Sequence, residues 1–528
     1  KIFPGTVRDC WIYVPAQYDA ANPACVLVIQ DGKAHWQPER RWHIPTILDN
    51  LIHQQAIPVM IGIFIDPGVI PAPLAGGASR VNRSFEYDSR GDGYARFLLE
   101  EVLPEVGRRY NLASEANSRA IMGGSSGAMC AFNAAWERPD AFSRVLSIVG
   151  SYTAMRGGHT MAQLVRLTEP KPLRVFLESG ADDFKIYAGD WYAGNQDMLS
   201  ALTYAGYEVN HVWAEHAGHN DYHGSSIFPA ALRWLWQGYP APVKSGRSSQ
   251  PVMTVLIPGE TWQPVAGDYP SATALATSAA GDIFFASPEN ECIYRLASDG
   301  APQPWARKVA QVSAMTFGPD GALYASQPGK RRIVKFEPDG RMTVWIKGID
   351  AGGLSFTAKG SAFVSDPAQS KLWLLTPDKA WRVVDDTIAS PWAVQLFGGG
   401  AQLIVSDAHG PASWLFTVQP DGTLADRAPY FRPVMLGDEI NPGVTAIAVS
   451  PKGWPAFATT AGVQLGLKNG GLITGLIPPP GAEAGRVVLN APGFEGLTFG
   501  GAGFDHLYAS DGRRLYCRKI QLPDELWG

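Results

Sequence analysis

The stretch SRAIMGGSSGAMCAFNAAWERP, residues 118–139, decides the fold of the first half of the chain. It opens with the short apolar run SRAIMGG (118–124), turns through glycine and serine, and continues as GAMCAFNAAWERP (127–139). A short continuous apolar run bounded by turn residues is typical of a strand buried on both faces, and the longer run after it favours a helix. The stretch therefore predicts a strand, a tight turn and a helix in direct succession.

The segments on either side repeat this alternation of strands and helices. The elements predicted around it are strands at 24–32, 58–66, 144–152, 173–180 and 208–215, and helices at 94–110 and 226–239. Alternating β and α elements imply a mostly parallel sheet that is covered by helices on both sides. We therefore expect residues 1–239 to form one α/β domain.

After residue 239 the character of the sequence changes. PAPVKSGRSSQP (240–251) is rich in Pro, Ser and Gly, and we place a linker at 240–255. Beyond it no long helix is predicted, and a unit of strand, Gly-containing turn and strand recurs. Its copies lie at 271–287, 312–326, 351–366, 390–407, 443–460 and 494–511. Six units about 40 to 53 residues apart predict a six-bladed β-propeller over residues 256–528, whereas a β-sandwich would not explain their fixed internal order.

The composition excludes several classes of function. The 528 residues are 46% hydrophobic and 18% charged, which is normal for a globular protein of more than one domain. The formal net charge of -5 and the lack of a basic run argue against nucleic acid or an anionic membrane surface as partner. No apolar stretch reaches the roughly 20 residues of a membrane span. The five cysteines include Cys10 and Cys25, which could pair, but free buried thiols are favoured.

Residues 123–127 read Gly-Gly-Ser-Ser-Gly and match the pattern G-x-S-x-G. The pattern gains weight from its context, because it follows a buried strand and leads directly into a helix, as a nucleophile elbow requires. Such an elbow holds its serine in a strained conformation, and the two outer glycines avoid clashes in the turn. We therefore predict Ser125 as a nucleophile, with the backbone amide of Ser126 facing a developing oxyanion.

A serine hydroxyl needs a base to take its proton, and this type of fold supplies its partners in the order Ser, acid, His. Asp183 follows a predicted strand in GADDF, and His219 follows the next one in AGHND. Both lie at the carboxyl ends of strands, so we predict them as the acid and the base. The alternatives are Asp182 for the acid, and His211, His216 or His223 for the base.

An oxyanion hole needs a second amide, which normally comes from the loop after an early strand. QDGKAHW (30–36) occupies that position in the sequence. We expect the Gly32–Lys33–Ala34 stretch to provide the amide and select Lys33. The alternative is an ordinary Asp-Gly turn.

Residues 4–238 resemble a family of esterases that includes enterochelin, feruloyl and acetyl xylan esterases. Besides the Ser125 elbow, the resemblance rests on WIYVPAQYD, VLVIQDG, NRSFEYD, ARFLLEEVLPEV, GADDF, GDWYAGNQDM and GHNDYHG. It implies an α/β-hydrolase fold with Ser125, Asp183 and His219 as the catalytic triad. The elbow departs slightly from the family pattern, which has a bulky residue and then two glycines after the serine, because Ser126-Gly127-Ala128 stands there.

Two of these motifs resemble stretches near the substrate cleft of such enzymes. They are NRSFEYD and GDWYAGNQ. We accordingly expect substrate contacts from Arg83, Glu86, Tyr87, Trp191, Tyr192 and Asn195. The alternative is that these residues are ion-paired or packed within loops.

Residues 256–520 resemble the gluconolactonase and senescence-marker-protein family, through FGPDGALYAS, RRIVKFEPDG, SDAHGPASWLFTVQPDG and AGVQL. That family holds a divalent cation in the central channel with a Glu, Asn residues and an Asp. The equivalent positions in the repeat are Ser271, Ser313, Gly352, Trp392 and Thr445. Since none supplies a carboxylate, we expect a degenerate propeller without the catalytic metal, in which Glu495 and Asp438 are stray acids.

The resemblance implies a serine ester hydrolase that acts through an acyl-Ser125 intermediate and needs no cofactor. Its expected substrates are feruloyl or acetyl esters of plant cell-wall polysaccharide, with the propeller as an accessory domain. The alternatives are a siderophore ester as substrate, or a metal-dependent sugar lactonase in the propeller. We also expect a secreted or periplasmic location.

Overall fold

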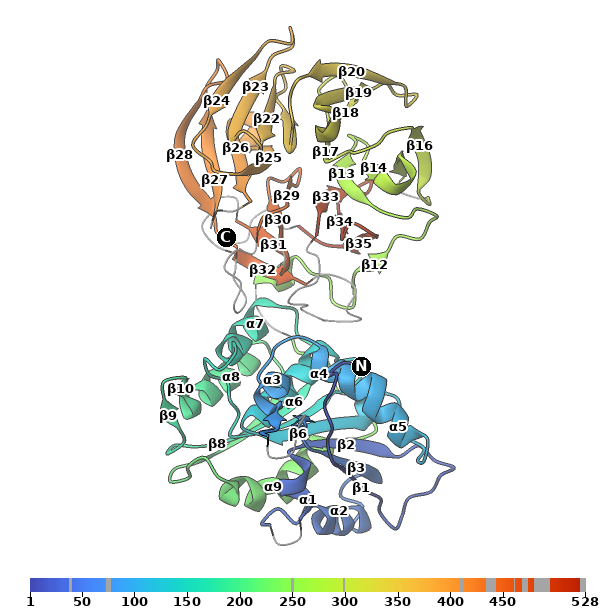
Figure 1. Ribbon diagram of the computed structural model, residues 1–528, viewed down its shortest axis with the longest axis vertical. Coiled ribbons are helices and arrows are strands. Elements are labelled where there is room, and N and C mark those ends of the chain that lie inside the picture. The colour runs from blue at the N-terminus through green and yellow to red at the C-terminus, as the bar shows by residue number, and fades with distance from the viewer. Residues whose placement is uncertain are drawn as a thin grey trace. The chain divides into compact units, whose positions relative to one another are not determined.

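The chain divides into two compact units, with the boundary between residues 249 and 250, and each unit is described by itself (Figure 1). The computed structural model describes residues 1–37, 40–72, 77–247, 251–297, 300–408, 410, 412–433, 443–459, 461–467, 473–478 and 494–522. Among these residues, no helix is long and apolar enough to cross a membrane.

The first unit is built on a seven-stranded mixed sheet with the order β1-β3-β2-β6-β7-β8-β11. Its strands are β1 (Cys10–Tyr13), β2 (Cys25–Gln30), β3 (Met60–Ile65), β6 (Arg119–Gly124), β7 (Arg144–Ile148), β8 (Arg174–Gly180) and β11 (Glu208–Ala214). All neighbours pair in parallel except β1, which runs antiparallel to β3 at the edge. Every residue of β2, β3 and β7 is buried, as continuous apolar runs predict for strands covered on both faces.

Helices cover both faces of this sheet (Figure 1). On one face, α2 (Ile44–His53) and α9 (Asp221–Trp236) pack into a single apolar core with side chains of the central strands. The helices on the other face include α6 (Ser126–Glu137), α7 (Met161–Leu167) and α8 (Trp191–Tyr204). This arrangement places the loops at the carboxyl ends of the parallel strands along one edge of the sheet.

The helix predicted at 94–110 forms over Gly93–Gly107, but not as one regular α-helix. It consists of α4 (Gly93–Phe97), a π-helical segment at Leu98–Val102 and α5 (Leu103–Gly107). Pro104 has no N–H to donate to the preceding turn, which explains why the hydrogen-bond register changes just before it.

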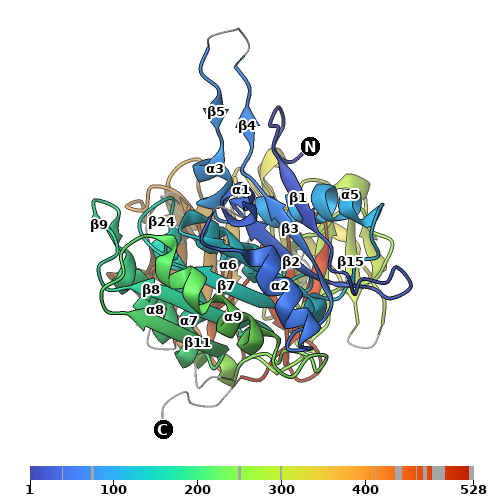
Figure 2. The same cartoon turned by 90° about the horizontal axis from the view of Figure 1, so that it is seen from below.

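Several short elements complete the first unit. They are α1 (Gly32–Trp36), α3 (Arg83–Tyr87) and the hairpins β4 (Val69–Ile70) with β5 (Arg80–Val81) and β9 (Lys185–Ile186) with β10 (Gly189–Asp190). Figure 2 shows β4 and β5 standing away from the sheet.

The predicted linker does not behave as a free tether over its described residues. The Asn117 side chain donates hydrogen bonds to the Pro240 and Ala241 carbonyls and accepts one from the Val243 amide, which ties this part to the first unit. At the other end of the linker, Val255 is buried in an apolar cluster of the second unit. A Pro- and Ser-rich composition predicts irregular backbone, but it does not prevent such a segment from packing.

The second unit is a six-bladed β-propeller, with each blade a four-stranded antiparallel sheet among the described residues. The first three blades are β13 (Thr273–Thr277), β14 (Ile283–Ser287), β15 (Cys292–Leu296), β16 (Gln303–Arg307); β17 (Ala314–Phe317), β18 (Leu323–Gln327), β19 (Arg332–Phe336), β20 (Met342–Lys347); and β21 (Gly353–Phe356), β22 (Ala362–Asp366), β23 (Lys371–Leu375), β24 (Trp381–Asp385). The next two are β25 (Pro391–Phe397), β26 (Gln402–Asp407), β27 (Ser413–Val418), β28 (Leu424–Phe431); and β29 (Ala446–Val449), β30 (Pro455–Thr459), β31 (Gly462–Gly466), β32 (Ile473–Ile477).

The sixth blade joins the two ends of the propeller sequence. It has the order β12-β35-β34-β33, with β12 (Gln263–Pro264), β33 (Gly496–Gly500), β34 (His506–Ser510) and β35 (Leu515–Lys519). Because β12 precedes the first blade in the chain, its antiparallel pairing with β35 closes the ring. Each of the six predicted copies contains the first strand of a blade and the strand paired to it, except that the copy at 312–326 ends one residue before the end of β18.

The five cysteines are free thiols, and Cys10 does not pair with Cys25. Cys25 is buried as expected, whereas Cys10 is exposed because it begins the edge strand β1.

A buried lysine makes the stability of the first unit depend on pH. The Lys171 ammonium donates to the Trp136 carbonyl at 2.6 Å and lies 3.9 Å from the centre of the Trp136 ring. Burial lowers the pKa of Lys171 from 10.5 to about 7, while the nearby Glu137 carboxylate opposes the shift. Between about pH 7 and pH 10.5 the Lys171 amine is protonated in the unfolded chain but not in the folded chain. The free energy of unfolding therefore rises with pH across this window. The contribution of Lys171 to stability is complete above about pH 10.5 and is lost as the pH falls toward 7.

We expect the Lys171→Met variant to lack this dependence. Its free energy of unfolding relative to the parent should fall as the pH rises from 7 to 10, by up to about 1.4 kcal/mol per pH unit for one proton. Urea unfolding of the full chain at several pH values measures the difference. Lys185→Met is the control, because the Lys185 side chain is 63% exposed and should leave the slope of the parent unchanged. Parallel curves for Lys171→Met and the parent would contradict the prediction.

Candidate active site

Ser125 lies in the turn between β6 and α6 with φ 59° and ψ -123°, a conformation that side chains rarely adopt. The turn is too tight for a side chain at position 123. A Cβ atom on Gly123 would lie 2.3 Å from the carbonyl carbon of Gly127. The amide of Ser125 donates to the Ile148 carbonyl at 2.9 Å, which fixes the turn to the end of the neighbouring strand β7. Gly123 is therefore required by the local geometry, whereas Gly127 is tightly packed, with the nearest atoms to a Cβ at 3.2 Å.

The structure brings Ser125, His219 and Asp183 together. His219 Nε2 lies 2.8 Å from Ser125 Oγ, and His219 Nδ1 lies 2.6 Å from Asp183 Oδ1. The Asp183 side chain is fully buried and also accepts a hydrogen bond from the Phe184 amide at 2.7 Å. The three residues follow β6, β11 and β8, so parallel strands deliver all of them to one edge of the sheet.

The alternatives considered for the acid and the base lie elsewhere. The Asp182 side chain is 67% exposed, and its nearest basic group is His216 at 3.9 Å. His211 is exposed on β11. His223 Nδ1 is bound to the buried Glu178 at 2.7 Å, where burial raises the pKa of the Glu178 carboxyl.

Two aromatic rings hold the imidazole of His219. Phe184 stacks on it, with ring centres 4.2 Å apart and planes 19° apart. Trp191 meets the same ring edge-on, with centres 6.1 Å apart. These two ring contacts restrict rotation of the imidazole, whose nitrogen atoms contact Ser125 and Asp183.

Of the two amides expected in an oxyanion hole, one is available. The Ser126 amide is at the N-terminus of α6 and has no acceptor among the described residues. The amides of Ala128 and Met129, later in the same turn, donate to the Ser125 carbonyl. This amide and the helix N-terminus favour negative charge beside Ser125.

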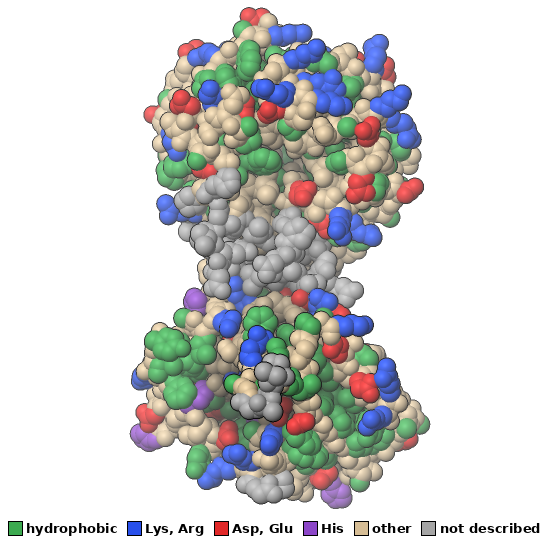
Figure 3. Space-filling model, viewed as in Figure 1, with side chains coloured by type: hydrophobic (Ala, Val, Ile, Leu, Met, Phe, Trp, Pro, Cys, Tyr) green, Lys and Arg blue, Asp and Glu red, His purple; other side chains and the backbone are tan. Residues whose placement is uncertain are grey.

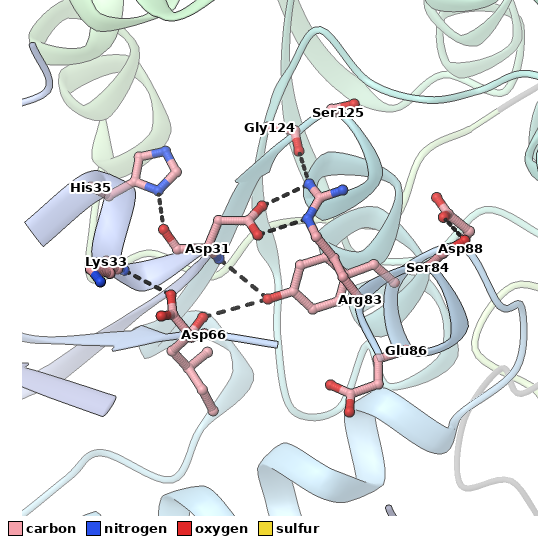
Figure 4. Close-up of polar contacts among 12 residues, drawn as sticks. Asp31, Lys33, His35, Asp66, Arg83, Ser84, Glu86, Asp88, Gly124 and Ser125 are labelled. Atoms are coloured by element: carbon pink, nitrogen blue, oxygen red, sulfur yellow. Dashed lines mark hydrogen bonds and ion pairs between the residues drawn. The ribbon is translucent and has the colours of Figure 1, made fainter. Parts of the chain in front are cut away.

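The expectation for Lys33 is corrected by the structure. Its amide donates to Asp66 Oδ1 at 2.8 Å, so this N–H is already satisfied within the domain (Figure 4). The Ala34 amide donates to the Asp31 carbonyl at 3.0 Å. Of the 32–34 stretch, only the Gly32 amide has no acceptor among the described residues. Asp31 lies against the elbow, since a Cβ atom on Gly127 would be 3.2 Å from its Oδ2.

Arg83 lies beside the elbow, as Figure 4 shows. Its Nε and Nη2 each donate to one oxygen of Asp31 at 2.8 Å, and Nη2 lies 3.5 Å from the Gly124 carbonyl. Burial opposes the charge of the Arg83 guanidinium, but hydrogen bonding and attraction to Asp31 together raise its pKa. The side chain is 33% exposed, and its Nη1 has no acceptor among the described residues. Arg83 can therefore offer one further donor to a molecule at the site.

The expectation that Glu86 and Tyr87 face the substrate is corrected, because both side chains are buried. Glu86 is bound by Arg8 through two hydrogen bonds, at 2.7 and 3.0 Å, and by the Asn82 side chain. The Tyr87 hydroxyl accepts from the Asp31 amide at 3.2 Å, and burial raises its pKa well above 10. Tyr87 thus holds the loop that begins at Asp31, and Glu86 ties helix α3 to Arg8.

Trp191 and Asn195 are also buried rather than open to a substrate. Trp191 Nε1 donates to Ser151 Oγ at 3.0 Å, and Asn195 Nδ2 donates to the Gly150 carbonyl at 2.8 Å. Both residues of α8 therefore hold the loop after β7. Tyr192 is half-buried and packs edge-on against Trp213.

Asp31 and Ser151 lie at the site but were not selected from the sequence. Asp31 binds Arg83, and Ser151 Oγ lies 3.3 Å from Ser125 Oγ. Their positions in the sequence indicate this location, because each residue comes shortly after a buried strand, β2 or β7, that ends at the same edge of the sheet as β6.

A small apolar surface adjoins His219. On the β9–β10 hairpin and just before it, Phe184, Ile186 and Tyr187 are 47%, 48% and 96% exposed. Figure 3 shows hydrophobic side chains gathered over this hairpin. Since Phe184 also stacks on the His219 imidazole, this surface adjoins that ring directly.

The propeller has a separate cavity of about 330 Å³ that is lined by the first strands of its blades. Ser313, Gly352, Trp392 and Thr445 line it, as does Glu495, whereas Ser271 instead binds Ser287. Asp438 lies outside the described residues. Glu495 is the only carboxylate among the described lining residues, and a hard divalent cation takes six to eight oxygen ligands. This set of donors does not fit the metal site of the family that the propeller resembles.

Comparison with known proteins gives a family match for the first unit. Residues 4–222 match the family described as "Putative esterase". The protein YbbA of Bacillus subtilis, described as uncharacterized, is 25% identical over 182 residues, which are 33% of this chain and 69% of YbbA.

Solved structures resemble each part of the chain. A gluconolactonase from Xanthomonas campestris is 16% identical, with a TM-score of 0.43, and the match covers 52% of this chain and 93% of that one. The enterobactin esterase of Shigella flexneri is 21% identical, with a TM-score of 0.34, covering 44% and 55% of the two chains. A ferulic acid esterase is 19% identical, with a TM-score of 0.35, covering 44% and 98%. The chain thus carries an esterase-family domain at its N-terminus, followed by a six-bladed β-propeller.

Proposed function

We propose that the first unit is a serine carboxylic-ester hydrolase of the α/β-hydrolase type. The observation that carries this proposal is the continuous contact from Ser125 Oγ to His219 Nε2 at 2.8 Å and from His219 Nδ1 to Asp183 Oδ1 at 2.6 Å. The strained turn of Ser125 between a strand and a helix, and the chain order Ser, Asp, His, are both features of that fold.

In the proposed reaction, His219 takes the proton of Ser125 as Oγ attacks the ester carbonyl carbon. The tetrahedral oxyanion is stabilised by the Ser126 amide, and a donor of this kind contributes on the order of 3 kcal/mol. His219 then gives its proton to the departing alcohol, which leaves an acyl-Ser125 ester. Water attacks that ester with His219 again as base, so that the acid is released and the Ser125 hydroxyl is restored.

We further propose that the natural substrates are carbohydrate-linked esters with an aromatic acyl group, such as feruloyl esters of plant cell-wall polysaccharide. The motif resemblance supports an ester of this kind, and the apolar surface of Phe184, Ile186 and Tyr187 supports an aromatic group beside His219. The propeller is then an accessory domain. Acetyl and siderophore esters are the other candidates.

Hydrolysis of methyl ferulate and methyl acetate tests this proposal, because the two esters share one leaving group. We expect kcat/KM for methyl ferulate to be at least about tenfold higher, which corresponds to roughly 1.4 kcal/mol of additional binding in the transition state. EDTA should leave both rates unchanged. If activity disappears with EDTA but survives in Ser125→Ala, the chemistry belongs to the propeller as a metal-dependent lactonase. Equal rates for the two esters would contradict the aromatic specificity alone.

A further inference from the structure

A buried serine extends the proposed triad beyond Ser125. Ser151 is 1% exposed, and its Oγ has two contacts, with Ser125 Oγ at 3.3 Å and with Trp191 Nε1 at 3.0 Å. The side chains of Ser125, Ser151 and Trp191 make these contacts directly with one another. The role of Ser151 depends on which oxygen donates the proton in the contact between the two serines.

The chemistry of the two ends decides this direction. The indole nitrogen of Trp191 can only donate, and the carboxylate of Asp183 can only accept. His219 Nδ1 therefore carries the proton that is shared with Asp183, and Nε2 accepts the only proton of Ser125. Ser125 Oγ then has lone pairs alone to offer to Ser151.

The Ser151 hydroxyl must consequently be the donor to Ser125. It accepts from Trp191 on one side, and its own proton points at Ser125 Oγ. The hydrogen bonds run in one direction, from Trp191 through Ser151, Ser125 and His219 to Asp183. Because the indole N–H at one end can only donate and the carboxylate at the other end can only accept, this series of hydrogen bonds cannot run in the reverse direction.

The backbone around Ser151 is held in a conformation that it would not adopt alone. Val149 has φ 43°, which is a costly value for a β-branched residue. Its amide donates to the Glu178 carbonyl at 2.8 Å, and the Gly150 carbonyl accepts from Asn195. The Ser151 amide donates to the Ser125 carbonyl at 3.2 Å. Strand β8, helix α8 and the elbow thus position this hydroxyl from three sides.

We propose that Ser151 is a catalytic hydrogen-bond donor to Ser125 Oγ, with Trp191 as the residue that fixes its direction. This inference rests on the proposed function. When His219 takes the proton of Ser125, negative charge develops on Oγ, and the fixed Ser151 donor stabilises it. When the acyl-enzyme breaks down, Oγ becomes the leaving group and the same donor stabilises the charge again. The contact of 3.3 Å shortens as the charge grows.

The test uses the full chain and two reactions of Ser125. One is hydrolysis of p-nitrophenyl acetate, and the other is the rate at which a fluorophosphonate labels Ser125, in which Oγ bonds to phosphorus, fluoride departs and His219 takes the proton. For Ser151→Ala we expect both rates to fall about 10- to 100-fold, with KM nearly unchanged. A purely structural defect would instead alter KM or the melting temperature.

Ser147→Ala is the matched control. Ser147 is a fully buried serine on β7, and its hydroxyl is hydrogen-bonded to the Tyr152 hydroxyl at 2.9 Å rather than to a residue of the proposed triad. This variant should keep both rates within about twofold, because it removes a neutral hydrogen bond that does not touch a reacting atom. Equal losses in the two variants would overturn the proposal, because they would show a packing effect.

Two further variants keep the inference testable if Ser151→Ala does not fold. Ser151→Thr keeps the hydroxyl and should recover most of the labelling rate. Trp191→Phe keeps a ring beside His219 but removes the N–H, so its labelling rate should fall less than that of Ser151→Ala but clearly below the parent. Parent-like rates in Ser151→Ala, with Ser125→Ala inert, would overturn the role of Ser151 and leave the proposed function standing. Turnover or labelling that survives in Ser125→Ala would overturn the proposed function itself.

Discussion

Replacing Ser125 by alanine is expected to lower kcat/KM for p-nitrophenyl acetate by about 10⁴- to 10⁶-fold. In the proposed mechanism the Ser125 hydroxyl is the nucleophile, and neither His219 nor an amide donor can replace the covalent step. The small rate that remains would come from binding and oxyanion stabilisation alone. Steady-state assays with active-site labelling by the fluorophosphonate measure both the rate and the loss of the labelled residue.

The fold should tolerate this change. Among the described residues, the Ser125 hydroxyl is hydrogen-bonded to His219 and Ser151, and alanine fits the same turn without adding volume. We expect the melting temperature to stay within about 4 °C of the parent, which corresponds to roughly 1 kcal/mol for a domain of this size. Ser147→Ala again provides a serine of the same domain whose loss should not affect turnover. An enzyme that retains a tenth or more of its activity without Ser125 would contradict the assignment of the nucleophile.

The features predicted best from the sequence are those that depend on local pattern. Continuous apolar runs gave the strands β2, β3 and β6, because burial on both faces requires apolar side chains at successive positions. The repeated unit of strand, Gly-containing turn and strand indicated the blades of the propeller, because each blade uses the same local pattern. The positions of Ser125, Asp183 and His219 followed from strand ends, since parallel strands deliver their carboxyl ends to the same edge.

The features that the sequence did not reveal depend on partners far along the chain. The Lys33 amide is bound by Asp66, which is 33 residues away, and Glu86 is bound by Arg8, 78 residues away. No local pattern marks such a partner. A motif near a cleft therefore contains both residues that can reach a substrate, such as Arg83, and residues that only support the loop.

The GDWYAGNQ motif shows the same difficulty. Its resemblance to cleft-lining stretches suggested substrate contacts from Trp191 and Asn195, yet both donate hydrogen bonds to the loop that carries Ser151, 40 and 45 residues earlier in the chain. The motif does lie at the site, but it contacts Ser125 through a second loop, the one that carries Ser151. Which side of a helix faces the solvent and which faces the sheet was decided by the packing of α8 on β8 and β11, and the sequence motif alone does not contain that information.

The largest effect expected from a residue that does not bond to the substrate belongs to Asp183. For Asp183→Asn we expect kcat to fall by about 10³- to 10⁴-fold with little change in KM. Asp183 is fully buried and accepts from His219 Nδ1 at 2.6 Å and from the Phe184 amide at 2.7 Å. The amide of asparagine can fill the same space, but it carries no negative charge to stabilise the imidazolium that forms when His219 takes the proton of Ser125.

The adjacent residue supplies the control for this prediction. Asp182 has the same chemistry, but its side chain is 67% exposed and lies 3.9 Å from His216 rather than at His219. Asp182→Asn should therefore keep kcat within about twofold, since an exposed ion pair contributes little. Steady-state kinetics of both variants at one pH separate the two carboxylates, and melting temperatures show that each variant is folded. If Asp182→Asn lost turnover and Asp183→Asn kept it, the acid would be Asp182 and the buried contact of Asp183 would serve only to hold the loop after β8.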